Sequence, residues 1–239
     1  MKLFNLHNIR LVLMMLGLLV LLSFANNRHH HKVLNSVHVD FLDTSKMFIT
    51  ELEVEHLLKE NLAEIQDSIL NEANLKHFEN VLNTNEMIKS TEVFYDLNGK
   101  LTASVVQREP IARVYDQGFY YLDEDGLAMP MSQNYSARVP MVSGVSAENL
   151  SEIYPLLLKI REDDFLKKHI IAIRKKLANN YILEVRDKDF IVNFGQISYL
   201  DQKLKNYKIF YHKALEYKKL DSYKHIDLQF GNQVVCTKK

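Results

Sequence analysis

An unbroken apolar run near the N-terminus, from Leu11 to Leu22, limits which architectures this chain can adopt. Extended to residues 9–25, the segment would form a helix of roughly 25 Å at ~1.5 Å per residue, at the short end for crossing a bilayer. It also fits a signal peptide, because Lys2 and Arg10 form a basic start and Ser23-Phe24-Ala25 resembles a small-x-small cleavage site. From this segment alone, an uncleaved anchor and a cleaved signal both stay open, and both export residues 26–239.

The composition of the chain argues against several classes of protein. Its 30 basic and 30 acidic residues balance, so no global field would attract nucleic acid or an anionic membrane. No two of its 7 glycines have the spacing of a phosphate-binding loop. The single cysteine, Cys236, excludes an intrachain disulfide framework and any multi-cysteine metal site. We therefore expect no cofactor.

Residues 33–108 predict a strand, two helices and a hairpin, in that order. Thr50 and Glu53 form a capping box that opens the first helix, because each side chain can bond the other residue's amide. A second helix follows near Asn74, where apolar residues recur at helical spacing. Asn98-Gly99 between two strand-like segments is a strong hairpin signal, since a type I′ turn needs positive φ at both central residues. The expected order is βααββ.

The distribution of proline indicates a domain boundary near residues 108–110, because all four prolines of the chain occur from Pro110 onward. Beyond it we expect a second, β-rich domain at 109–236. Its expected elements are strands at 111–115 and 119–122, a helix at 147–161, strands at 168–174, 181–187 and 189–194, a helix at 199–220 and a last strand at 223–236. The predicted fold class is α+β, with a stub at 1–8 and a transmembrane helix at 9–25 before the two domains.

Several clusters of polar residues resemble chemical sites, but none has the spacing that a site requires. His29-His30-His31 on a polar joint lacks a carboxylate at ligand spacing, and Asp123 to Gly126 fits a turn better than a calcium loop. Asp163-Asp164 is most simply a solvated helix end, because adjacent side chains diverge. The lysines of the long helix, from Lys203 to Lys219, are most simply a solvent-exposed face. The more specific alternative is that they contact a partner protein. The sequence predicts no catalytic residue and no metal site.

Four stretches behind the apolar segment, in the same order, resemble the bacterial cell-division family FtsQ/DivIB. Residues 105–113 resemble the family's joint, a strand followed by Glu-x-x-Pro-(Ile/Val)-Ala-Arg. Residues 120–126 resemble its Asp-x-x-Gly hairpin, 139–144 its Leu-Pro-x-x-x-Gly, and 223–235 its terminal strand. Two positions depart from the pattern: Gln107 stands for a glutamate, and Gln229-Phe230 replaces Arg-Tyr.

The resemblance implies a non-enzymatic division scaffold with a POTRA-like first domain. It favours an uncleaved anchor in the inner membrane, a cytoplasmic N-terminus and a periplasmic bulk at the division site. The implied partners are FtsB and FtsL, through which the septal peptidoglycan synthase would be recruited and regulated. The alternative is a POTRA-containing outer-membrane assembly or secretion component, although one POTRA copy without barrel strands argues against it.

We expect the partner site at the C-terminal strand, because an open sheet edge exposes N–H and C=O groups that a partner segment can pair by β-augmentation. The candidate partner-binding residues are Ile226, Leu228, Phe230, Asn232, Gln233, Val234 and Val235. The resemblance itself points to Phe230, Asn232 and Gln233. Alternatively, this edge packs against its own helix and its apolar side chains are core. The predicted interdomain joint consists of Gln107, Pro110 and Arg113.

Overall fold

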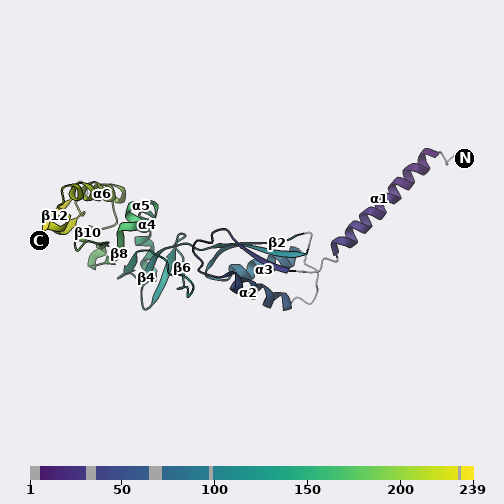
Figure 1. The fold of residues 1–239 in the computed structure, drawn as a ribbon, viewed down its shortest axis with the longest axis horizontal. Helices are drawn as coiled ribbons and strands as arrows, with labels where there is room; N and C mark the ends of the chain where they lie inside the picture. The colour runs from purple at the N-terminus through teal and green to yellow at the C-terminus, as the bar shows by residue number, and fades with distance from the viewer. Residues whose placement is uncertain (1–5, 31–35, 65–71, 97–98, 231–232) are drawn as a thin grey trace. The chain divides into compact units, whose positions relative to one another are not determined.

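The computed structural model describes residues 6–30, 36–64, 72–96, 99–230 and 233–239 (Figure 1). The chain divides into two compact units. The first comprises Met1–Ser45 and Ile49–Gln107, and the second comprises Lys46–Phe48 and Arg108–Lys239. The second unit is therefore discontinuous in sequence: the segment Lys46–Phe48 and Arg108, all within the domain predicted at 33–108, group with it.

The N-terminal segment forms a helix, α1 (Leu6–His30). Its large apolar side chains between Leu11 and Leu22 are exposed on all sides. Within the described part of the chain, no helix combines the length and the apolar character needed to span a membrane. The transmembrane helix predicted at 9–25 is therefore not found. The side chains of His29 and His30, and all of His31, lie outside the described residues.

The first unit has the expected βααββ order. Its elements are β1 (Ser36–Phe41), α2 (Glu51–Glu64), α3 (Glu72–Asn83), β2 (Ile88–Tyr95) and β3 (Lys100–Gln107). β3 lies in the middle of a three-stranded sheet, parallel to β1 and antiparallel to β2. The two helices bury Val54, Leu58, Phe78 and Leu82 in one core with the inward residues of the sheet. This burial of an apolar face is the main source of stability for helices of this length.

Two local signals explain where these elements begin and turn. The backbone N–H of Thr50 donates to Glu53 Oε2 at 2.7 Å, and the N–H of Glu53 donates back to Thr50 Oγ1 at 3.3 Å, so the predicted capping box is confirmed. Gly99 has φ 87°, the conformation that the predicted hairpin requires. Asn98, the other residue of that turn, lies outside the described residues.

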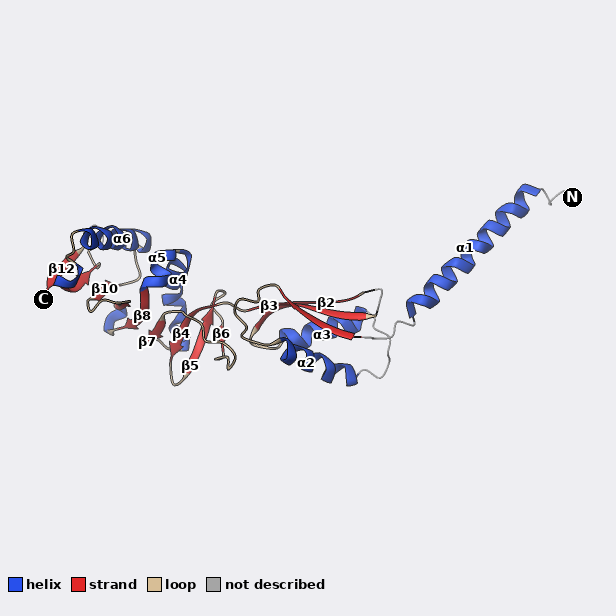
Figure 2. Cartoon of the chain, in the orientation of Figure 1, coloured by secondary structure: helices blue, strands red, loops and turns tan. Residues whose placement is uncertain are grey.

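The second unit is built on a nine-stranded sheet in the order β12-β11-β10-β9-β8-β7-β4-β5-β6. Figure 2 shows strands of this unit in red and its helices in blue. Its strands are β4 (Pro110–Tyr115), β5 (Phe119–Asp123), β6 (Ala128–Met129), β7 (Met141–Ser143), β8 (Ile170–Lys175), β9 (Tyr181–Val185), β10 (Ile191–Gly195), β11 (Tyr223–Asp227) and β12 (Val235–Lys238). Its helices are α4 (Leu150–Glu162), α5 (Asp164–His169) and α6 (Leu200–Glu216), with 3₁₀ turns at Ala147–Asn149, Leu177–Asn179 and Leu220–Ser222. The mixed α+β class is confirmed.

One row of residues across this sheet forms the centre of the core. The row consists of Val114, Val142, Ile173, Leu183, Val192 and Ile226, which pair in register and are fully buried. They share one cluster with inward residues of α4 and α6, such as Ile153 and Tyr207. Because side chains alternate along a strand, the rows on either side of this one lie on the opposite face of the sheet.

Several elements of the second unit differ from the sequence expectations. The strand predicted at 168–174 begins only at Ile170, because α5 precedes it. Asp163 is the N-cap of α5, and its Oδ1 accepts the N–H groups of Phe165 and Leu166 at 3.0 Å each. The short strands β6 and β7 were not predicted, since two or three residues are too few to show a period. The residues Asp123 to Gly126 form a turn, as expected.

Candidate functional site at the C-terminal sheet edge

Strand β12 is the last strand of the nine-stranded sheet, at one edge. It pairs antiparallel with β11, with Ile226 opposite Cys236 and Asp227 opposite Val235. In the described part of the chain, no strand pairs with its other side. Most of its side chains are exposed, and Cys236 is half-buried, which raises the pKa of its thiol. Because backbone groups of an edge strand alternate in direction, every second residue of β12 directs its N–H and C=O away from β11.

The predicted strand at 223–236 is wrong as a single element. The chain leaves the strand conformation after Asp227, whose Oδ1 accepts the N–H of Gln229 at 2.9 Å. It then turns back, with the N–H of Gln233 donating to the carbonyl of Phe230 at 3.0 Å. A side chain that bonds to its own backbone two residues ahead competes with the ladder of the sheet. β11 and β12 are therefore the two arms of a hairpin.

Six of the seven predicted partner-binding residues are described, and they fall into three groups by exposure. Ile226 and Leu228 are 0% and 2% exposed and belong to the core, so the structure places them where a partner's side chains do not reach. Phe230 and Val235 are 55% and 41% exposed, and Gln233 is exposed as well. Val234 is half-buried and packs against the core. Asn232 lies outside the described residues.

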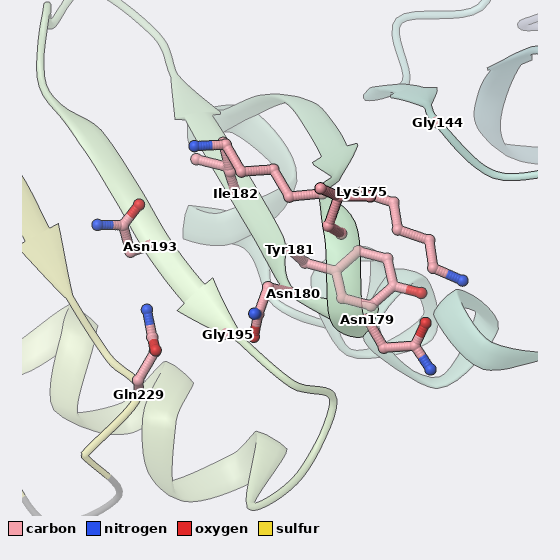
Figure 3. A pocket seen from close by; sticks show the side chains of 11 residues that line it. Gly144, Lys175, Asn179, Asn180, Tyr181, Ile182, Asn193, Gly195 and Gln229 are labelled. Atoms are coloured by element: carbon pink, nitrogen blue, oxygen red, sulfur yellow. The ribbon is translucent and has the colours of Figure 1, made fainter.

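An open groove of about 850 Å³ adjoins the hairpin (Figure 3). Asn193 of β10 and Gln229, the second residue after β11, line it from neighbouring segments, and the Gln229 amide points toward Asn193 (Figure 3). Asn179 and Asn180, from the turn after β8, also line the groove. Amide side chains both donate and accept hydrogen bonds, which suits them to recognise the main chain of an extended segment. Sequence reasoning missed this groove, because strands and loops that are distant along the chain line it together.

The Lys175 ammonium group and the Tyr181 hydroxyl, which both line the groove, already form hydrogen bonds to Glu152. Lys175 Nζ donates to Glu152 Oε2 at 2.6 Å, and the Tyr181 hydroxyl donates to the same oxygen at 3.2 Å. Burial, reinforced by this carboxylate, raises the pKa of Tyr181 to about 12. Tyr181 is 2% exposed, so it supports the wall of the groove and does not present a flat ring to a ligand.

A buried lysine fixes the end of β10 beside the groove. Lys203 of α6 is 3% exposed, and its Nζ donates to the carbonyls of Phe194 at 3.0 Å and Gln196 at 2.8 Å. Burial lowers the pKa of its ammonium group. The interpretation of the helix lysines as one solvated face is therefore wrong at Lys203. Gly195 lies between the residues that carry these two carbonyls and has φ +74°. Its missing side chain makes space for the Gln229 side chain, because a Cβ at this position would lie 2.5 Å from Gln229 Cγ.

The three predicted joint residues occupy separate places. Gln107 ends β3 in the first unit, where its Oε1 accepts the N–H of Ile49 at 3.1 Å. Pro110 begins β4 in the second unit and is buried. Arg113 holds neighbouring segments of that unit together: its guanidinium donates to the Tyr121 hydroxyl at 3.1 Å and to Ser136 Oγ at 2.6 Å.

The fold and the open edge define the class of protein: a POTRA-like βααββ unit followed by a mixed β unit that ends in an exposed hairpin. Residues 32–106 match the model for a POTRA-like domain, and residues 109–237 match the model described as FtsQ/DivIB, C-terminal related. The chain belongs to the FtsQ/DivIB family. A search among curated proteins found no match. The family comprises non-enzymatic division scaffolds, and its domains indicate a role in cell division through protein–protein interactions.

Proposed function

We propose that this protein captures a segment of FtsB, in complex with FtsL, by adding a strand to β12. The observation that supports this proposal is the exposed, unpartnered side of β12 in the described part of the chain. Main-chain hydrogen bonds along β12 would supply the affinity, and side chains beside it would supply the specificity. Phe230 is the strongest side-chain candidate, because an exposed aromatic ring next to a free edge is the type of residue that dominates binding interfaces.

The groove lined by Asn193 and Gln229 extends this proposed interface toward the centre of the sheet. A partner that adds one strand at β12 could continue across the groove, where the two amides would bond its backbone. The bound partner would in turn help to recruit and regulate the septal peptidoglycan synthase. In this role the protein binds and positions other proteins, and it carries out no reaction itself.

The same proposal includes a location. We place the chain at the inner membrane of the division site, attached through residues 9–25, with a cytoplasmic N-terminus and a periplasmic bulk. The support is the apolar run from Leu11 to Leu22. Its large apolar side chains are exposed around α1, as a helix surrounded by lipid requires. Mass spectrometry of the protein extracted from membranes tests the attachment. A mature N-terminus at Asn26, or recovery of the full-length chain from the aqueous fraction only, would overturn it.

The partner site is tested by pull-down of the periplasmic regions of FtsB and FtsL with the full chain. Phe230→Ala should weaken capture by about tenfold, with no change in melting temperature because the ring is exposed. Gln233→Glu adds an unpaired charge at the same hairpin and should also weaken capture. Tyr217→Ala is the matched control: this ring is 67% exposed but lies at the end of α6. If removal of residues 233–239 leaves capture intact, the edge-strand proposal is wrong.

A further inference from the structure

The second unit contains a pocket that none of the features above uses. It has a volume of about 270 Å³. Its apolar wall is formed by Phe48, Pro110, Ile111, Ala137, Pro140 and Ile160. All six of these residues are buried and belong to the second unit. None of the residues that line the pocket comes from β11, β12 or the hairpin between them, so the pocket is separate from the proposed FtsB site.

The charged residues at this pocket are of two kinds. The first kind is paired within the protein: Glu109 accepts hydrogen bonds from Lys46 at 2.8 Å and Arg161 at 2.6 Å, and Arg161 also bonds Glu124 at 2.6 Å. The Lys46 hydrogen bond, followed by that of Arg161, lowers the pKa of Glu109 to about 2, so this carboxylate stays ionised. These pairs give the rim a fixed shape and leave little charge for a ligand.

The second kind consists of two exposed cations. Arg138 and Lys167 line the pocket, and neither forms an ion pair with another residue of the described part of the chain. They come from different elements, the extended segment before β7 and helix α5, so their charges approach the pocket from separate parts of the fold. The rim therefore has an excess of positive charge beside an apolar wall.

We propose that this pocket binds an apolar side chain of a partner peptide whose neighbouring residues are acidic. The apolar walls favour a hydrophobic group, and Arg138 and Lys167 favour carboxylates on either side of it. The volume lies just below the roughly 300–1,000 Å³ typical of sites for drug-sized molecules, so one large side chain fits it better than a whole ligand does. The protein would thus have two peptide-binding sites. The β12 edge would bind the main chain of one segment, and the pocket would bind the side chains of an acidic segment with one apolar residue.

The test uses the full chain and three fluorescein-labelled probes, measured by fluorescence polarisation. The probe Gly-Asp-Phe-Glu-amide should bind about tenfold more tightly than Gly-Lys-Phe-Lys-amide, which reverses the charges, and than Gly-Asp-Ala-Glu-amide, which lacks the ring. Because short peptides bind weakly, titration should extend to about 1 mM protein. Equal binding of the acidic and basic probes, or no saturable binding of the acidic one, overturns the proposal.

Variants then locate the binding site. The double substitution Arg138→Glu and Lys167→Glu should raise the Kd of the acidic probe by about tenfold or more, and both positions are exposed, so the fold should persist. The matched control is Lys205→Glu with Lys213→Glu, two exposed lysines of α6 that do not line the pocket. Val139→Phe, which places a ring in the pocket, should also weaken binding. If the rim variant and the control change the Kd equally, or if Val139→Phe leaves it unchanged in a protein of unaltered melting temperature, the probe binds elsewhere and the proposal is wrong.

Discussion

At the scale of single residues, Gly144 illustrates how closely two strands of the second unit approach. It follows β7 with φ +77°, and a Cβ at this position would lie 2.6 Å from the carbonyl oxygen of Lys175. That oxygen belongs to the backbone of β8, so it cannot move aside cheaply. We expect Gly144→Ala to lower the free energy of unfolding of the second unit by about 2–4 kcal/mol, through the left-handed conformation and the overlap together.

Gly118 is the matched control for this substitution. An added Cβ there would meet nothing within 4 Å, and the residue does not have positive φ. Gly118→Ala should therefore be neutral, or stabilising by up to about 1 kcal/mol through a smaller loss of chain entropy. Native-state hydrogen exchange of the sheet amides measures both variants in the second unit alone. Equal effects of the two substitutions would contradict the steric explanation.

His169 makes the stability of the second unit depend on pH. Its Nε2 lies 2.7 Å from the Tyr207 hydroxyl, and burial, with a further contribution from Arg186, lowers the pKa of the imidazole from 6.5 to about 4. Between these values the unfolded chain binds a proton that the folded protein does not. The stability that neutral His169 provides is therefore complete above pH 6.5 and is lost as the pH falls toward 4.

His169→Gln should reduce this loss, because glutamine can bond Tyr207 but does not titrate. The measurement is the free energy of unfolding of the second unit at several pH values between about 4 and 7. His212→Gln, at an exposed position of α6, is the control and should keep the wild-type slope. A slope that is the same in the His169→Gln variant and the wild-type protein would show that another group is responsible.

At the scale of secondary-structure elements, the start of α2 rests on one capping box. Replacing Thr50 by Ala removes the acceptor of the Glu53 N–H, and we expect the first turn of α2 to lose about 1 kcal/mol. Thr50→Ser keeps the hydroxyl and should change little. Hydrogen-exchange protection of the α2 amides separates these outcomes, and equal protection in the two variants would show that packing alone fixes the helix start.

The same elements show what could be predicted from the sequence and what could not. The first unit was predictable because its signals are local: a capping box, a helical period and an Asn-Gly turn each involve a few adjacent residues. The break after Asp227 also had a local signal, its carboxylate two residues before Gln229, but the alternating pattern of 223–236 outweighed it. α5 was missed because its six residues are too few to show a helical period.

The candidate site was only partly predictable, for a different reason. Alternation places Ile226 and Leu228 on one face with Phe230, but it does not tell which face α4 and α6 cover. Those helices bury the first two residues, whereas the turn after Asp227 leaves Phe230 exposed. Lys203 was misassigned because its two acceptors are carbonyls at the end of β10, which no helix pattern can indicate. Such tertiary contacts decide which residues a partner can reach.

At the scale of the whole molecule, the second unit depends on a segment that lies within the first in sequence. Phe48 is 3% exposed, and its ring packs edge-on against Tyr121 at 6.1 Å and Tyr135 at 5.2 Å between centroids. Its carbonyl accepts hydrogen bonds from Ser132 Oγ at 2.5 Å and from the Asn134 side chain at 3.3 Å. The segment Lys46–Phe48 therefore completes the second unit, although it stands between β1 and α2 along the chain.

Phe48→Ala distinguishes this arrangement from the division expected from sequence. If Phe48 belonged to a domain at 33–108, Phe48→Ala would reduce hydrogen-exchange protection in the first unit. The structure instead predicts that β4 and β5 of the second unit lose hydrogen-exchange protection, by about 3–5 kcal/mol, because a buried ring is removed from between two tyrosines. Phe78→Ala is the control: its ring is 0% exposed in the core of the first unit, so protection should fall in β1, β2 and β3 instead. If Phe48→Ala and Phe78→Ala weaken the same strands, Lys46–Phe48 is not part of the second unit in solution, and the apolar wall that Phe48 contributes to the proposed peptide pocket would be lost with it.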